Sequence, residues 1–449
     1  MRAGWPVGAV LGSESELLER YGVSRPTLRE AIRLLEHRQI AVMRRGPGGG
    51  LSVTAPDSSA VAGAATAYLE YSHVTVRDVV EGLTVLQPMA AALAARRIDE
   101  DGIVRLRRLV SSEPAGGQWD RHHRFHGELA VISGDPALEL FIDVSAQLLD
   151  RYAARTLATR PIWAAEMART EGDVARAQAR LAEAVIQGNA QLAEHIAARH
   201  LAAMLSWVEE TGARLTGVAG EAGSDGSPAI PAARLATAVA ERIRHDIRRS
   251  GWTVGANLGA EPLLQHRYQV SRTVLREAVR LLEYQGVASM RTGRSGGLLV
   301  AEPDADAVAA AVSLYLNYRH VRSRGLAAVQ MTIELGCLDI LAGRFGEQAK
   351  DGLRAAVAAE ASGPPGTEQA FHVALAELTR NPVLGLWVRV LHSLLSDGAD
   401  AAGEWKSADD LEGGGLRAVQ ETHVGIATAL LQGDAALARH RMLRHLQQF

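Results

Sequence analysis

The segment "VSRPTLREAIRLLE" at residues 23–36 returns later in the chain as "VSRTVLREAVRLLE" at residues 270–283. Ser24 and Ser271 are 247 positions apart, and this offset aligns residues 1–57 with 248–304 without an insertion. More than half of the aligned residues are identical, which exceeds what a shared helical periodicity produces. The sequence therefore predicts a duplicated domain built around this segment.

The similarity continues more weakly behind each copy. "RFHGELAVISGDPALEL" (124–140) pairs with "AFHVALAELTRNPVLGL" (370–386), and "ARHLAAM" (198–204) pairs with "LRHLQQF" (443–449). The stretch between the repeats is rich in Gly, Ser, Ala and Pro, which is typical of a linker. We therefore expect five parts: a first head at 1–57, a first helical tail at 58–210, a linker at 211–231, a second head at 232–304 and a second helical tail at 305–449.

Each head carries the pattern of two helices separated by a turn. In "ESELLERYGVSRPTLREAIRLLE" (14–36), Gly22 marks the turn and Ser24 is a favourable N-cap for the second helix. Apolar residues recur on one face of that helix, while Arg25, Arg29 and Arg33 recur every four residues on another face. An exposed arginine row after a helix and a turn is typical of a DNA-reading helix-turn-helix. The alternative is that the row is only the solvated face of a surface helix.

The second head has an additional amphipathic helix in front of it, at residues 232–251. Because residue 1 aligns with residue 248, the first head has no counterpart of this helix in the sequence. Two explanations are open: the first head lacks the helix, or the native start lies upstream.

A glycine-rich hairpin is predicted after each helix-turn-helix. "IAVMRRGPGGGLSV" (40–53) and "VASMRTGRSGGLLV" (287–300) each place two short apolar strands around a turn. Such a wing brings basic side chains to the phosphate backbone or the minor groove, here Arg44, Arg45, Arg291 and Arg294. The run "GPGGG" is not followed by GKS or GKT, so a nucleotide-binding loop is not favoured.

Together, these residues resemble the winged helix-turn-helix of GntR-type bacterial transcription regulators, and the tails resemble the all-helical sensing domain of the FadR-like (FCD) branch. The resemblance implies a mainly α chain with two winged helix-turn-helix domains, each with a small β-hairpin wing, and two all-helical bundle sensor domains. It also implies contacts to base edges or phosphates from Arg25, Thr27 and Arg29, and from Arg272, Thr273 and Arg276. The family's further arginine in the preceding helix is replaced by Ser15 and Pro262.

The second tail contains a candidate metal site. Glu368 and His372 are four residues apart and share one helix face, while His423 and His445 lie on two later predicted helices. One carboxylate and three imidazoles suit a divalent ion such as zinc, nickel or manganese. Histidines on helices are more often surface or core groups, but FCD domains commonly hold a metal with an Asp and three His at these motif positions. By the resemblance, Glu368 takes the place of the usual Asp.

The first tail departs from this pattern. His126 and His200 align with two of the histidines, but His122 stands at the carboxylate position and Gln178 at the third imidazole. We therefore expect a weaker, altered or empty site there, with Asp120 or His123 as substitutes. In the FCD branch a small carboxylate effector commonly binds with help from an arginine, but the matching positions hold Leu83 and Gln330. A carboxylate effector is accordingly only one option.

Composition bounds the remaining alternatives. The net charge is -3, and the single cysteine, Cys337, excludes an internal disulfide framework and a CxxC zinc module. We find no secretory signal or membrane-spanning stretch and expect a cytoplasmic protein.

The leading hypothesis is a ligand-responsive transcription regulator, not an enzyme. Its two recognition helices would bind a double-stranded DNA operator as an intramolecular pseudo-dimer, with a further homodimer as an option. The alternative is a metal-dependent enzyme built on the His/Glu site, although no HExxH motif or evident general base is present. In a third hypothesis the first repeat serves regulation or dimerisation and no longer reads DNA.

Overall fold

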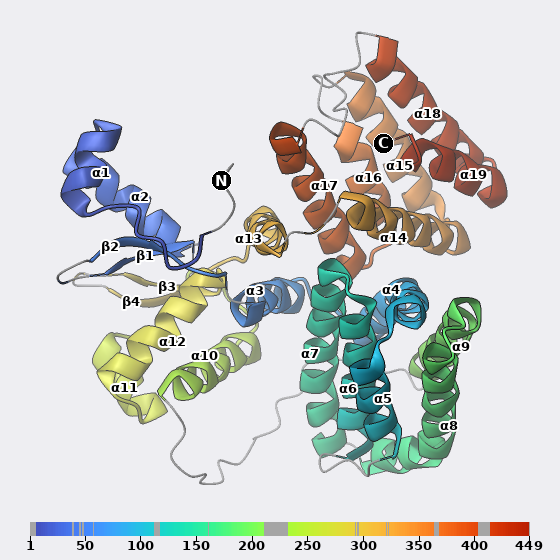
Figure 1. The fold of residues 1–449 in the computed structure, drawn as a ribbon, viewed down its shortest axis with the longest axis horizontal. Coiled ribbons are helices and arrows are strands. Elements are labelled where there is room, and N and C mark those ends of the chain that lie inside the picture. The colour runs from blue at the N-terminus through green and yellow to red at the C-terminus, as the bar shows by residue number, and fades with distance from the viewer. Residues whose placement is uncertain are drawn as a thin grey trace. The chain divides into compact units, whose positions relative to one another are not determined.

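A computed structural model describes residues 6–37, 40–44, 46, 49–56, 58–111, 117–159, 161–210, 232–291, 293, 296–319, 321, 323–362, 368–402 and 414–448. These residues form nineteen helices and four strands, which confirms the mainly helical fold with two small hairpins. The chain divides into two compact units, one of residues 1–71 and 225–320 and the other of residues 72–224 and 321–449 (Figure 1). The first unit holds both heads, and the second holds both sensor domains.

The first head is built from α1 (Glu14–Tyr21), α2 (Arg25–His37), β1 (Ala41–Arg44) and β2 (Gly50–Val53). Ser13 caps α1 in a capping box with Glu16, and Gly22 ends this helix at φ 60°, where glycine avoids the strain of a side chain. The backbone amide of Thr27 donates to the Ser24 hydroxyl at 3.3 Å, so Ser24 caps α2 as predicted. The two strands pair antiparallel, with Ala41 opposite Val53.

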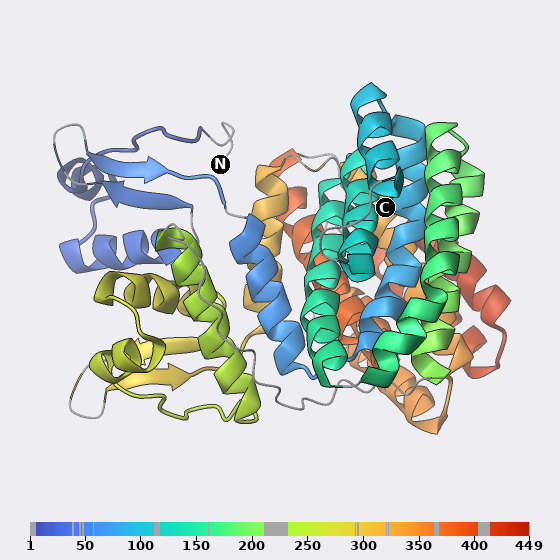
Figure 2. The same cartoon turned by 90° about the horizontal axis from the view of Figure 1, so that it is seen from below.

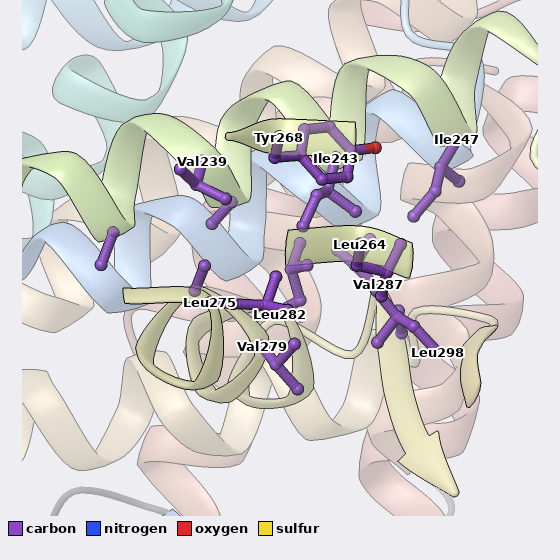
Figure 3. Close-up of a cluster of buried hydrophobic side chains, with 14 of the residues drawn as sticks. Val239, Ile243, Ile247, Leu264, Tyr268, Leu275, Val279, Leu282, Val287 and Leu298 are labelled. Carbon is purple, nitrogen blue, oxygen red and sulfur yellow. The ribbon is translucent and has the colours of Figure 1, made fainter. Parts of the chain in front are cut away.

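The second head repeats this arrangement with one more helix. Its elements are α10 (Ala232–Arg249), α11 (Glu261–Tyr268), α12 (Arg272–Tyr284), β3 (Ala288–Arg291) and β4 (Gly297–Val300). Figure 3 shows Val239, Ile243 and Ile247 of α10 beside Tyr268 and the apolar side chains of α12. This burial gives the second head a larger apolar core than the five buried residues clustered in the first.

The matched tyrosines of the two heads show what α10 contributes. Tyr268 is 3% exposed and donates its hydroxyl hydrogen bond to Asp246 of α10 at 2.7 Å. Tyr21, at the corresponding position, is 62% exposed. The described residues before α1, 6–13, form turns and a bridge between Val10 and Ser52 rather than a helix. The tyrosine position that α10 covers in the second head is therefore exposed in the first.

Among the described residues, one helix follows each wing and six further helices form each sensor domain. Figure 2 shows the sensor unit as packed helices. The wings are followed by α3 (Ser58–Tyr71) and α13 (Ala305–Tyr318). The first sensor domain consists of α4 (Val76–Arg97), α5 (Glu100–Ser111), α6 (Gly117–Ser133), α7 (Pro136–Thr159), α8 (Pro161–Ile186) and α9 (Ala190–Glu210). The second consists of α14 (Ser323–Gly343), α15 (Glu347–Ser362), α16 (Glu368–Leu378), α17 (Pro382–Ala402), α18 (Gly414–Leu431) and α19 (Ala435–Leu446).

The two sensor domains meet through corresponding residues. A Cβ added to Gly336 would lie 2.6 Å from a methyl group of Val85, and the Thr332 hydroxyl lies 3.2 Å from the Met89 sulfur. These two pairs exchange under the 247-residue offset, because position 85 corresponds to 332 and position 89 to 336. Such reciprocal contacts are the mark of a local two-fold relation.

Helices α4 and α14 are also long and apolar enough, by length and composition, to cross a membrane. In the described fold each packs against several helices of its own sensor domain, and about two thirds of the apolar window in α4 is buried. We therefore interpret both as core helices, which pass the same test.

Candidate nucleic-acid interface and candidate metal centre

Each head presents two recognition arginines to solvent. The side chains of Arg25 and Arg29 on α2 are 67% and 63% exposed, and those of Arg272 and Arg276 on α12 are 64% and 61% exposed. Buried apolar residues on the opposite face fix both helices, so the arginines point away from the core. This arrangement suits insertion into a major groove.

A single carboxylate on the preceding helix holds each arginine pair. Glu261 accepts hydrogen bonds from Nε of Arg272 at 3.0 Å and of Arg276 at 2.9 Å. Its pKa is lowered, mainly by the Arg272 hydrogen bond and also by Arg276. In the first head Glu14 accepts from Arg29 at 3.0 Å and lies 3.6 Å from Arg25. The repeated geometry fixes where the guanidinium groups point.

The structure places some of the remaining residues predicted to contact DNA, and others lie outside the described residues. Arg44 and Arg291 end strands β1 and β3 and are exposed. Thr27 shares a hydrogen bond of 2.7 Å with Ser24, and Thr273 is exposed on α12. Two further wing residues lie outside the described residues: Arg45 and Arg294.

In the second sensor domain, three imidazoles from three helices converge. The Nε2 atoms of His423 and His445 are 3.1 Å apart, and those of His445 and His372 are 3.2 Å apart. All three side chains are buried, and their nitrogens form a possible metal-binding group. In a tetrahedral zinc site with Zn–N bonds of about 2.0–2.1 Å, two ligand nitrogens are separated by about 3.3 Å. The spacing therefore fits one ion bound by three histidines.

Two buried carboxylates orient these rings. The Nδ1 atom of His423 donates to Glu360 at 2.7 Å, and Nδ1 of His372 donates to Glu334. Because a carboxylate only accepts, each contact leaves the Nε2 lone pair facing the shared space. Paired carboxylates of this kind fix the tautomer of metal-binding histidines.

The charge states of the groups agree with this role. Burial, with His372 and His423 nearby, lowers the pKa of His445 to about 3, so its ring is neutral at ordinary pH. Burial would raise the pKa of Glu334, but His372 and then His392 hold it well below its usual value. A neutral His445 ring can bind a metal, and an ionised Glu334 carboxylate can accept a hydrogen bond from His372. The residues present thus fit a divalent metal.

The structure adds residues that the sequence did not single out. The side chain of the predicted ligand Glu368 lies outside the described residues, although its backbone begins α16. Glu334 and His392 instead form a second buried group with His372. A charged residue within the apolar stretch "MTIELGCLDILAG" was the available signal for Glu334. Its distance in sequence from His372 concealed the contact.

The first sensor domain keeps two of the three rings. His126 and His200 stack with centroids 5.5 Å apart, close to the 5.2 Å between their counterparts His372 and His445. Burial, followed by His200 and His123, lowers the pKa of His126 well below its usual value. Gln178 is buried on α8, and the His122 side chain lies outside the described residues. The described part of this domain therefore stacks His126 on His200, and the suggested substitute His123 is buried and lines one pocket with His126.

Comparison with known families identifies both parts of the chain. The model of the FCD domain matches residues 78–203 and 326–448, which together exceed half of the chain. The model of the bacterial regulatory proteins of the gntR family matches residues 1–50 and 235–297. The chain belongs to the GntR family, with FCD sensor domains. Members of this family are transcription regulators, and the predicted regulator function is thereby confirmed for this GntR protein.

Individual relatives align with one half of this GntR chain. The HTH-type transcriptional regulator LutR of Bacillus subtilis is 27% identical over 199 residues, covering 43% of this chain and 89% of the relative. The putative HTH-type transcriptional regulator RmpR of Mycobacterium gastri is 29% identical over 202 residues, covering 43% and 70%. These similarities give no support to the enzyme alternative.

Solved structures of similar proteins include further GntR regulators. Streptococcus agalactiae GntR is 20% identical, with a TM-score of 0.35, and covers 47% of this chain and 97% of its own. The McbR/YncC protein of E. coli is 19% identical, with a TM-score of 0.22, and covers 48% and 94%.

Proposed function

We propose that both heads of this regulator bind one DNA operator as an intramolecular pseudo-dimer and that the second sensor domain binds a divalent metal. The observation that carries the DNA proposal is the repeated, carboxylate-held pair of exposed arginines on α2 and α12. Two such helices from one chain fit two half-sites of an operator. The half-sites need not be identical, because Pro26 and Thr27 correspond to Thr273 and Val274.

The DNA proposal is tested with two double variants, R25A/R29A and R272A/R276A. Binding to DNA from the protein's own promoter region and to random DNA is measured by fluorescence anisotropy at physiological salt. We expect each double variant to lose at least about 30-fold in operator affinity, since each of the two lost contacts contributes about 1–3 kcal/mol.

R354A is the control for loss of an arginine elsewhere, because Arg354 is exposed on α15 of a sensor domain. Operator binding that survives R25A/R29A unchanged would instead support a first repeat that no longer reads DNA. Equal affinity of the wild type for operator and random DNA would overturn the proposal altogether.

For the metal, we propose zinc, nickel or manganese held by His372, His423 and His445, with Glu368 as a fourth ligand. The three converging Nε2 atoms support this assignment. A bound divalent ion would supply a Lewis-acidic position for an oxygen donor of an effector, of which a small carboxylate is one class. The imidazoles position that ion, and Glu334 and Glu360 hold the imidazoles.

Elemental analysis of the purified chain tests the metal proposal. About one ion per chain is expected for the wild type, and close to none for H423A, because one imidazole of three is lost. The variant H245A removes a histidine of the head unit and is expected to retain the ion. Metal content that is equal in wild type and H423A would contradict the site.

The part boundaries given above, 1–57, 58–210, 211–231, 232–304 and 305–449, remain our proposal for the domains. Within it the operator is double-stranded DNA, the effector is a small molecule, and the protein acts in the cytoplasm. Whether the chain also forms a homodimer is decided by light scattering on the purified protein.

A further inference from the structure

A small pocket in the first sensor domain occupies the place of a side chain in the second. It is lined by Gln87, His123, His126 and Ala146 and by three aliphatic side chains. We call it the Gln87 pocket. At the offsets that align the two repeats, Gln87 corresponds to Glu334, His126 to His372 and Ala146 to His392.

The second sensor domain shows what fills this place when the larger residues are present. The Glu334 carboxylate contacts three polar groups: His372, His392 at 3.3 Å and the side-chain amide of Gln330, which donates at 2.7 Å. The His372 and His392 rings have centroids 5.1 Å apart. Polar side chains of the same domain thus satisfy this buried carboxylate.

The first sensor domain has lost two of those partners. Leu83 stands at the position of Gln330, and Ala146 replaces the imidazole of His392 with a methyl group. Gln87 is fully buried, and neither its oxygen nor its nitrogen has a hydrogen-bond partner among the described residues. Leaving a buried amide unpaired costs about 1–3 kcal/mol for each group. A group that pairs with both ends of the amide would recover this free energy.

The lining indicates the chemistry of that group. Apart from imidazoles, the described lining residues are an amide and apolar side chains, and the nearby charged group among the described residues is the Asp150 carboxylate, which contacts His123 and would disfavour an anion. A buried charged ligand would need a counter-charge, whereas an uncharged one needs only hydrogen bonds. Because an imidazole fills the equivalent space in the second domain, the ligand should be of about that size.

We propose that the first sensor domain binds a small uncharged ligand with a planar donor-and-acceptor group, such as a primary amide or an azole, on Gln87. The two sensor domains then recognise different chemistry, one through three imidazoles and the other through a neutral carboxamide. The inference relies on the proposed function only in treating this domain as a sensor.

Fluoroacetamide and fluoroacetate form a suitable probe pair, because they have similar shapes and differ in charge. Their binding to the full chain is measured by fluorine NMR. Binding at the Gln87 pocket is the part of the measured binding that is lost in the variant A146H. This variant introduces the histidine of the second domain and fills the pocket. We expect saturable fluoroacetamide binding that weakens at least about tenfold in A146H. Fluoroacetate binding should be the same in the wild type and in A146H, because any binding of this anion at the metal site is unaffected by the variant.

A second variant, Q87L, guards against misfolding of A146H. Since Gln87 has no partner among the described residues, Q87L should unfold at the same temperature as the wild type or higher. It should weaken fluoroacetamide binding about tenfold, as expected for a lost hydrogen bond. The proposal is overturned if the wild type does not bind fluoroacetamide, if Q87L binds it equally well, or if fluoroacetate is preferred.

Operator binding without the probe is measured on the same proteins. Intact operator binding together with any of these negative results rejects the ligand and leaves the regulator function standing. If the wild type shows no preference for the operator over random DNA, the pseudo-dimer proposal is rejected. The result with the probe pair still decides whether the Gln87 pocket binds an uncharged ligand.

Discussion

A single glutamate in each head forms ion pairs with the two arginines that we propose contact DNA. Glu261 and Glu14 are negatively charged groups close to the surface that would meet DNA phosphates. They order the arginines before binding, but they also oppose the negatively charged DNA. Their effect on specificity and on overall affinity should therefore have opposite signs.

We predict that E261Q raises affinity for random DNA and reduces the preference for the operator. The repulsion is removed, while Arg272 and Arg276 lose their common acceptor. Because the pKa of Glu261 is lowered, the carboxylate is ionised at neutral pH, and its effect is lost as the pH falls through that lowered value. Anisotropy titrations with both DNAs test this, with E347Q on the sensor unit as the charge-matched control. An operator preference that is unchanged or higher in E261Q would contradict it.

At the sensor domains, one residue distinguishes the two histidine clusters. His126 and His200 already stack like the matching pair of the second domain, but Gln178 stands where the third imidazole is expected. We predict that Q178H raises the metal content from about one to about two ions per chain, measured by elemental analysis. The control is Q187H, which changes an exposed residue directly after α8, the helix that carries Gln178. A content that stays at one would show that the stacked pair cannot be completed.

The carboxylate of Glu360, which accepts a hydrogen bond from His423, provides an independent test of the proposed metal site in the second sensor domain. We predict that E360Q weakens metal affinity about 10- to 100-fold, because the amide no longer holds His423 in the ligand tautomer as firmly. Competition with a chelator measures the change. The control E421Q alters an exposed carboxylate on the same helix as His423. Equal affinity of E360Q and the wild type would remove Glu360 from the site.

Among the elements, α10 makes the largest difference between the two heads. Val239, Ile243 and Ile247 are buried against the helix-turn-helix of the second head, and the matching face of the first head leaves Tyr21 exposed. Each fully buried aliphatic side chain contributes about 1.5–3 kcal/mol. The first head is therefore expected to be the less stable of the two.

We predict faster amide hydrogen exchange in α2 than in α12. Less buried apolar surface supports α2, so it should open at a lower free-energy cost. Hydrogen exchange followed by mass spectrometry resolves the two helices, because their peptides differ in sequence. The strand pairs β1–β2 and β3–β4 share the same register and serve as an internal reference. Equal protection of α2 and α12 would mean that α10 adds no stability.

For the molecule as a whole, the contact between α4 and α14 joins the two sensor domains. It is formed by the reciprocal pairs of Gly336 with Val85 and of Thr332 with Met89, and Phe141 stacks on Trp387 with centroids 3.9 Å apart. Phe141 and Trp387 correspond at the offset of the tails, so this pair lies at the centre of the local two-fold relation. A chain that carries both partners keeps this contact at any protein concentration.

We predict that G336V destabilises the chain by about 1–3 kcal/mol, because any Cβ at this position meets Val85 and the close packing cannot adjust freely. Thermal or urea unfolding measures the loss. The control is G343V, at the exposed end of the same helix, where no atom lies within 4 Å of an added Cβ. If both variants unfold alike, the cost belongs to helix propensity rather than to the contact.

The sequence by itself determined the local elements of the heads and their function. Caps, glycine turns and apolar periodicity act over a few residues, so Ser24, Gly22 and the arginine row could be interpreted without a structure. The duplication also allowed each head to be compared with the other. Both the mainly helical fold and the regulator family followed from these local patterns.

Only the tertiary structure decided which distant side chains meet. Glu334 and Glu360 precede His372 and His423 by 38 and 63 residues, and no periodicity links groups on different helices. The same holds for the unpaired Gln87 amide, whose position became informative only when Ala146 was found beside it. Helix packing sets these contacts through the shapes of many side chains at once, and that information is spread over the whole chain.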